Sequence, residues 1–187
     1  GEIFYGGEKI SGLSDADFMP YRKKIQMIFQ DPFNSLNPRM SVLQIISEPL
    51  GIHFKKMGRA ERRERVAQLL ETVGLPPDCM ARYPHEFSGG QRQRLAIARA
   101  IVRRPSIYLF DDSFSALDYR TDQELRRALK PVTQNAAVII VAQRISTIKD
   151  ADQILVMNQG RIEAVGTHEE LMQSSRTYQE IVASQPT

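Results

Sequence analysis

The chain has 187 residues, of which 42% are hydrophobic and 25% are charged, and it contains one cysteine and three histidines. This composition is typical of one or two globular domains. It excludes an intrachain disulfide, and it shows no evident metal cluster of thiolates and imidazoles. The net charge of +3 is too small to indicate a nucleic acid or a membrane surface as the partner. No apolar run approaches the roughly 20 residues that a membrane-spanning helix needs.

The N-terminal segment predicts a hairpin and a short helix. Two strand-like runs, at residues 2–5 and 9–10, flank a glycine pair that suits a tight turn. Residues 14–24 are mostly polar and predict a short helix or turn that is interrupted at Pro20.

A candidate buried strand follows over residues 25–29. Residues 30–38 contain two prolines and two asparagines, so they predict a loop after that strand. Residues 40–82 predict helices, because apolar residues recur at i, i+3, i+4 and i+7 from Val66 to Val73 and a glycine follows directly.

The stretch 86–100 predicts a helix with a ligand site at its start. Ser88 is a good N-cap, and Gly89 and Gly90 allow a ligand to approach the backbone closely. Apolar residues recur at helical spacing from Gln91 onward, so we expect a helix whose N-terminus is bare. Free N–H groups, a hydroxyl and an amide at a helix start suit an anion, and phosphate best. For Ser-Gly-Gly alone, a capped amphipathic helix after a turn is an equal alternative.

The second half of the chain alternates strands with helices. Residues 107–110 predict an apolar strand that ends in two aspartates, and residues 138–141 predict a strand of the fully buried type. The other predicted elements are a helix with Leu125 and Leu129 on one face, a short helix near 145–149, a hairpin of 154–157 and 161–165 around Gly160, and a helical tail over 168–184. This alternation predicts an α/β fold with a parallel sheet and a helical insertion at about 40–85.

Four motifs resemble those of ABC-type ATPases. Ser-Gly-Gly-Gln-Arg-Gln-Arg at 88–94 resembles the signature motif of that family, and Ile-Tyr-Leu-Phe-Asp at 107–111 resembles its Walker B strand. Ser-Ala-Leu-Asp at 115–118 is similar to the D-loop, and Gln30, at the end of a predicted strand, is similar to the glutamine of the Q-loop.

The resemblance implies an α/β fold of the P-loop NTPase type (RecA-like), with a parallel sheet core. Residues 1–39 and 86–187 would form this core, which lacks the N-terminal strands and the Walker A loop. Residues 40–85 would form the helical subdomain typical of ABC ATPases.

The resemblance also implies the roles of single residues. The expected contacts to ATP are Ser88, Gly89, Gly90, Gln91 and Asp118. The expected Mg²⁺ ligands are Asp111 and Gln30, and a carboxylate at the carboxyl end of a parallel strand suits Mg²⁺ held through water. The expected catalytic positions are Asp112, Gln143 and Gln30, the last by reaching the attacking water.

Two of these positions depart from the family pattern. Asp112 stands where the family usually has a catalytic glutamate, and a shift of about 1 Å in a positioned base can cost about 10²-fold in rate. Gln143 stands at the switch histidine; it can hydrogen-bond a γ-phosphate but cannot carry the proton of an imidazole. Together the two changes resemble the degenerate site of heterodimeric ABC exporters.

A third departure is the absence of the Walker A pattern, Gly-x₄-Gly-Lys-[Ser/Thr]. Gly7 and Gly12 have the glycine spacing, but Leu13-Ser14 follows, so the phosphate-binding lysine is missing. In the family this loop lies upstream of where the chain begins, and a start at Gly1 rather than Met indicates a processed or truncated product. We expect that the isolated chain does not bind ATP with the affinity that is ordinary for such a domain. We also expect it to be inactive or very slow as an ATPase.

The two halves of the chain resemble different branches of the family. Residues 25–38 and 83–90 are similar to oligopeptide and dipeptide importer ATPases, whereas residues 107–118 and 166–171 are similar to exporter ATPase domains. The changeover lies between about residues 88 and 106. Two explanations are open: a recombined or engineered chain, or a natural subfamily that combines both patterns.

The resemblance implies the ATP-binding subunit or domain of an ABC transporter, which couples ATP binding and hydrolysis at a dimer interface to peptide import or to drug or lipid export. Its expected partners are a second ATP-binding domain and transmembrane permease domains, at the cytoplasmic face of the membrane. One alternative is a catalytically impaired half-site module that supplies the signature motif to the ATP of a partner. Another is a soluble ABC ATPase of DNA repair or translation, which the mild charge disfavours, so no nucleic acid is expected.

Overall fold

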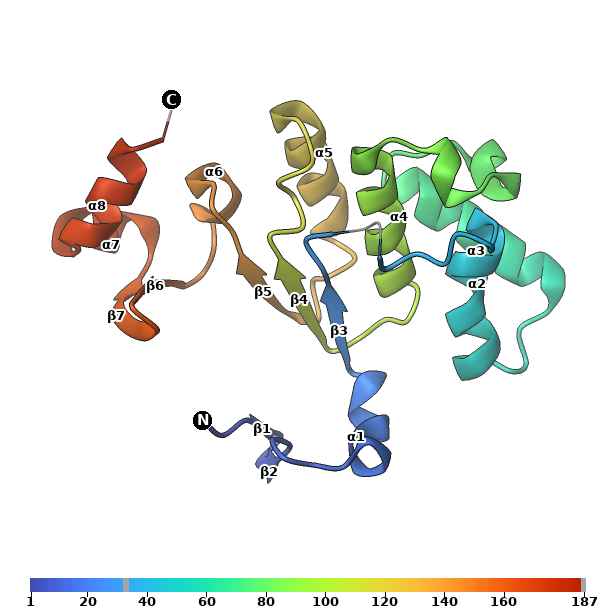
Figure 1. Ribbon diagram of the computed structural model, residues 1–187, viewed down its shortest axis with the longest axis horizontal. Coiled ribbons are helices and arrows are strands. Elements are labelled where there is room, and N and C mark those ends of the chain that lie inside the picture. The colour runs from blue at the N-terminus through green and yellow to red at the C-terminus, as the bar shows by residue number, and fades with distance from the viewer. Residues whose placement is uncertain (32–33, 186–187) are drawn as a thin grey trace. The chain divides into compact units, whose positions relative to one another are not determined.

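The computed structural model describes residues 1–31 and 34–185. The chain forms two compact units, residues 1–139 and 140–187 (Figure 1). This division does not correspond to the helical subdomain predicted over residues 40–85, whose bounds stay a prediction. Residues 32 and 33 of the predicted loop lie outside the described residues.

The first unit begins with the predicted hairpin and helix. Strand β1 (Phe4–Tyr5) pairs antiparallel with β2 (Glu8–Lys9), and α1 (Asp15–Arg22) follows. The expected interruption at Pro20 was wrong, because Pro20 lies inside α1. A proline removes one hydrogen bond and crowds the carbonyl four residues earlier, which weakens or kinks a helix without having to end it at that residue. Helix α1 ends two residues later.

The parallel sheet is the element that positions the predicted site. Strand β3 (Ile25–Ile28) pairs in parallel with β4 (Ile107–Asp111), and β5 (Ala137–Val141) completes the order β3-β4-β5. Ile28, Tyr108 and Phe110 are buried on one face of this sheet. The parallel pairing of strands separated by helices confirms the predicted α/β class.

The expectation that residues 138–141 form a fully buried strand was wrong. Val138, Ile139 and Val141 are 40%, 54% and 60% exposed. An apolar run shows what a strand would gain from burial, whereas burial itself requires a second layer packed on that strand.

Helices fill the chain between β3 and β4 and continue after β4. In order they are α2 (Val42–His53), α3 (Arg59–Thr72), the 3₁₀ helices η1 (Pro77–Ala81) and η2 (Pro84–Glu86), and α4 (Gly89–Ile101), with α5 (Tyr119–Leu129) after β4. The apolar face predicted for α3 is buried at Val66, Leu69 and Leu70, and Gly74 follows the helix in the left-handed region with φ +74°. Helix α4 packs against α2, α3 and β3 (Figure 1).

The second unit has a small core of its own. It contains α6 (Ile145–Ile148), the antiparallel hairpin β6 (Ile154–Asn158) and β7 (Arg161–Gly166), α7 (His168–Ser174) and α8 (Arg176–Ala183). Ile154, Val156, Leu171 and Tyr178 form its buried cluster. Within residues 1–31 and 34–185, the structure has no helix that is both long enough and apolar enough to cross a membrane.

Candidate functional site

The start of α4 carries the residues predicted to bind ATP. The Ser88 hydroxyl accepts a hydrogen bond from the Gln91 N–H at 3.3 Å, and the Gln91 side-chain oxygen accepts one from the Ser88 N–H at 2.9 Å. This capping box corrects the expectation of a bare N-terminus, because a polar side chain at the third helical position can fold back onto the cap. Among residues 1–31 and 34–185, the N–H groups of Gly89 and Gly90 are the ones at this helix start that have no hydrogen-bond acceptor.

The two glycines at this helix start have different surroundings. A Cβ on Gly90 would lie 3.3 Å from Leu117 Cδ2 and 3.4 Å from the Ala116 carbonyl oxygen, so the predicted D-loop packs directly on Gly90. A Cβ on Gly89 would meet no atom within 4 Å. Packing within the chain therefore explains the glycine at 90, and the open side of Gly89 leaves room for a ligand against the backbone.

The two predicted carboxylates lie at the carboxyl end of β4. Asp111 is the last residue of β4, and Asp112 follows in the left-handed region with φ +47°. Both residues are half-buried. A non-glycine residue with positive φ is uncommon and concentrates at functional sites. Sequence reasoning missed this backbone feature, because aspartate tolerates the conformation without any pattern that announces it.

Two side chains hold the backbone just before Gln30, at the end of β3 and one residue beyond it. One side chain follows β4 and the other belongs to α4. The Ser113 hydroxyl donates to the Ile28 carbonyl at 2.6 Å, and Gln93 Nε2 of α4 donates to the Phe29 carbonyl at 3.2 Å. Gln30 directly follows Phe29, and it is exposed. Sequence reasoning missed both Ser113 and Gln93, because Gln93 stands between Arg92 and Arg94 and nothing local marks it as buried.

Asp118 acts as the N-cap of α5. Its carboxylate accepts hydrogen bonds from the Thr121 N–H at 3.0 Å and from the Thr121 hydroxyl at 2.7 Å. The Thr121 hydroxyl and then its backbone N–H hold the pKa of the Asp118 carboxyl below its ordinary value. The side chain predicted to contact ATP therefore also has a structural task in the free chain.

Gln143 belongs to the second unit and follows β5. Its side chain is exposed, and its carbonyl oxygen accepts a hydrogen bond from Gln185 Nε2. The Gln185 side-chain oxygen in turn accepts from the Ile145 N–H at 2.8 Å. Gln185 thus holds the backbone on both sides of residue 144, a contact across 40 residues that no local sequence pattern signals.

The predicted Mg²⁺ site rests on few protein donors. Over residues 1–31 and 34–185, no group of three or more His, Cys, Asp or Glu side chains is arranged to hold a metal ion. Mg²⁺ keeps several waters and usually takes one or two carboxylates together with substrate phosphates. The donor set of Asp111 and Gln30, one carboxylate and one amide, fits an ion that is bound together with a nucleotide.

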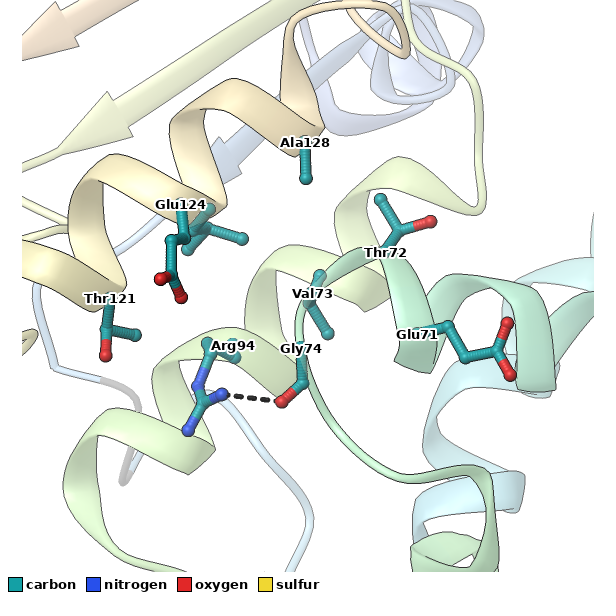
Figure 2. A pocket seen from close by; sticks show the side chains of 9 residues that line it. Glu71, Thr72, Val73, Gly74, Arg94, Thr121, Glu124 and Ala128 are labelled. Atoms are coloured by element: carbon teal, nitrogen blue, oxygen red, sulfur yellow. Dashed lines mark hydrogen bonds between the residues drawn. The ribbon is translucent and has the colours of Figure 1, made fainter.

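A pocket of about 250 Å³ lies elsewhere in the first unit, between the end of α3, α4 and α5. Figure 2 shows Arg94 reaching from α4 to the Gly74 carbonyl, to which its Nη1 donates at 2.8 Å. None of the residues predicted to contact nucleotide or metal lines this pocket. It is therefore not the predicted site.

The family model described as ABC transporter matches residues 1–115. Among curated proteins, the chain is 40% identical over 174 residues to the oligopeptide transport ATP-binding protein OppF of Escherichia coli (strain K12), covering 91% of this chain and 52% of that protein. It is 41% identical over 174 residues to the dipeptide transport ATP-binding protein DppF of Lactococcus lactis subsp. cremoris (strain MG1363), covering 91% and 56%. The chain thus spans about half the length of these relatives.

Two solved structures share the fold. One is a dimeric ATP-binding cassette in a post-hydrolysis state bound to ADP and Pi, with a TM-score of 0.82, 29% identity, and coverage of 90% of this chain and 73% of that one. The other is a bacterial Atm1-family ABC exporter with ATP bound, with a TM-score of 0.80, 30% identity, and coverage of 100% and 32%.

These matches extend through both halves of the chain, so the likeness to peptide-transport proteins is not confined to the first half. The hypothesis of a recombined chain stays a prediction. Three observations agree on the family of this chain. They are the motifs at 88–94 and 107–118, the fold around these motifs, and the match of the family model. The chain belongs to the ABC transporter family, in the branch of its ATP-binding cassettes.

Proposed function

We propose that this chain is the ATP-binding part of an ABC transporter for peptides and that its α4 contacts ATP held by a second ATP-binding domain. The observation that carries this proposal is the start of α4. A Cβ on Gly89 would meet open space, whereas one on Gly90 would meet Leu117 and the Ala116 carbonyl. The unsatisfied N–H groups there suit a phosphate. Ser88, Gln91 and Asp118 complete the proposed contact.

The proposed hydrolytic residues lie at the carboxyl edge of the sheet and after β5. Asp111 and Gln30 would hold Mg²⁺, which neutralises phosphate charge when it is bound. Asp112, Gln143 and Gln30 would orient the attacking water. Because this chain has no Walker A lysine, we propose that it is inactive or very slow by itself.

The proposed cargo is a peptide, in the direction of import. The choice of cargo follows the names of the relatives, which are oligopeptide and dipeptide transport ATP-binding proteins. The direction follows the resemblance of residues 25–38 and 83–90 to importer ATPases. The partners would be a second ATP-binding domain and transmembrane permease domains, which would keep the chain at the cytoplasmic face of the membrane.

The test is ATP hydrolysis by the chain alone and then in a mixture with a cassette that contains a Walker A loop. We expect turnover only in the mixture. Turnover by the chain alone would contradict its proposed dependence on a partner, and a mixture no faster than its separate components would contradict the contact to the ATP of a partner.

A pair of glycine variants identifies the contact. Gly89 and Gly58 both lie at the start of a helix, and a Cβ on either would meet no atom within 4 Å. Gly89→Ala would place a methyl group against the proposed phosphate, and we expect it to lower the stimulated rate by about 10²-fold, as displacement of a reacting group by about 1 Å can do. Gly58→Ala is the matched control and should leave the rate unchanged. Equal rates in both variants would place the nucleotide elsewhere.

A further inference from the structure

Helix α4 contacts the chain on both sides of Gln30. Gln93 Nε2 donates to the Phe29 carbonyl at 3.2 Å, one residue before Gln30. Arg99 Nη1 donates to the Ser35 carbonyl, five residues after Gln30. The helix whose N-cap is Ser88 therefore also holds the backbone at Phe29 and at Ser35, on either side of Gln30.

Gln93 is a poor choice for packing alone. Its side chain is 0% exposed, and its Oε1 has no hydrogen-bond partner among the residues that the structure describes. An apolar side chain of similar size would fill the same volume without leaving a buried acceptor unpaired. What the amide adds is one directed bond to Phe29.

The direction of that bond is fixed by chemistry. A carbonyl oxygen can only accept, so the amino group of the Gln93 amide must face Phe29. Arg99 supplies a second donor of fixed geometry. Burial lowers the pKa of its guanidinium, and the nearby positive charge of Arg103 lowers it further. Both contacts run from a side chain of α4 to a main-chain oxygen, so they constrain the backbone path and not a neighbouring side chain.

We propose that Gln93, together with Arg99, is a positioning residue that couples the nucleotide contact at Ser88 to the placement of Gln30. This inference rests on the proposed function. Gln93 acts through the Phe29 carbonyl and does not itself touch nucleotide or metal. A shift of α4 on nucleotide contact would move Gln30 through the backbone that Gln93 holds.

The first test measures amide hydrogen exchange in the chain alone. Gln93→Met removes the donor and the unpaired acceptor together, so the fold should persist. We expect amides of residues 28–31 to exchange at least about fivefold faster, the effect of losing one hydrogen bond, while residues 107–111 change little. Unchanged exchange at 28–31, or a uniform increase over the whole chain, would overturn the proposal.

Arg94→Met is the matched control. Arg94 lies on the same helix and also donates to a backbone carbonyl, but that carbonyl belongs to Gly74. This variant should loosen the turn at Gly74 and leave residues 28–31 protected. Loss of protection at 28–31 in Arg94→Met would contradict the specific role of Gln93, because any weakening of α4 would then have the same effect.

A nearly isosteric variant supplies a readout that packing alone would not give. In Gln93→Glu, a protonated carboxyl can donate to Phe29, whereas a carboxylate cannot. Burial raises the pKa of a carboxyl, so protection of residues 28–31 should return as the pH falls toward 5 and should be lost as the pH rises. The native chain and Gln93→Met should show no such switch, and a pH-independent Gln93→Glu would overturn the donor role.

The final test adds Mg²⁺-ATP and a partner cassette that contains a Walker A loop. In the native chain we expect new protection at residues 88–91 and also at 28–31, and in Gln93→Met only at residues 88–91. Lack of protection at 88–91 in the native chain would count against the proposed function. Protection at 88–91 without any at 28–31 in the native chain would count against the coupling alone.

Discussion

In α4, Leu95, Ile97 and Ala98 have no exposed surface, whereas Ile139 and Val141 of β5 expose 54% and 60% of theirs. Both elements carry apolar side chains, but those of α4 are covered because the helix packs against α2, α3 and β3. The comparison teaches that an apolar sequence shows which side chains would gain from burial, and that only the packing of the elements shows which of them are buried.

The largest expected effect comes from the same substitution made in each element. Ile97→Ala should lower the free energy of unfolding by about 2–5 kcal/mol, because it removes buried methyl groups and leaves a cavity. Ile139→Ala should cost about 1 kcal/mol or less, because its side chain is already half in water. Urea unfolding of both variants measures the difference, and equal losses would mean that β5 is as well covered as α4.

A second pair makes the comparison within a single helical turn. Gly90→Ala must displace Leu117 or the backbone at Ala116 by a few tenths of an ångström, whereas Gly89→Ala meets open space. We expect Gly90→Ala to be less stable than Gly89→Ala by about 1–3 kcal/mol, the usual effect of overpacking. Thermal unfolding measures this difference, and the reverse order would contradict the packing of the D-loop on α4.

The segment after β5 tests whether polar contacts replace packing there. Gln185→Ala removes the two hydrogen bonds to Gln143 and Ile145, each with a net contribution of about 0.5–1.5 kcal/mol. We expect faster hydrogen exchange at residues 143–146 and little change in the β6–β7 hairpin. Unaltered exchange at 143–146 would mean that other contacts hold this segment.

The smallest effect concerns the exposed cap of α5. The Thr121 hydroxyl lowers the pKa of Asp118, so the stabilisation from this group is present above the ordinary aspartate pKa of 3.8 and is lost as the pH falls through the lower folded value. An NMR titration should place the Asp118 midpoint below 3.8. Thr121→Val keeps the backbone N–H but lacks the hydroxyl, so its midpoint should lie closer to 3.8. Identical midpoints would show that the hydroxyl is not the cause.

Much of the fold could be predicted because its signals are local. Helical spacing from Val66 to Val73, the cap at Ser88 and the strand before Asp111 each lie within one element, and the structure has them where the sequence indicates. The prediction for Pro20 failed because the cost of one missing hydrogen bond depends on where the helix ends.

The sequence by itself determined the family, since the signature, Walker B and D-loop motifs are runs of neighbouring residues whose chemistry does not depend on distant packing. Only the tertiary structure decided which glycine of the signature is packed and which is open, and that Gln93 and Gln185 hold backbone far along the chain. The physical reason is range: a motif is set by adjacent residues, whereas a hydrogen bond between distant residues forms only after elements that are far apart in sequence have packed together.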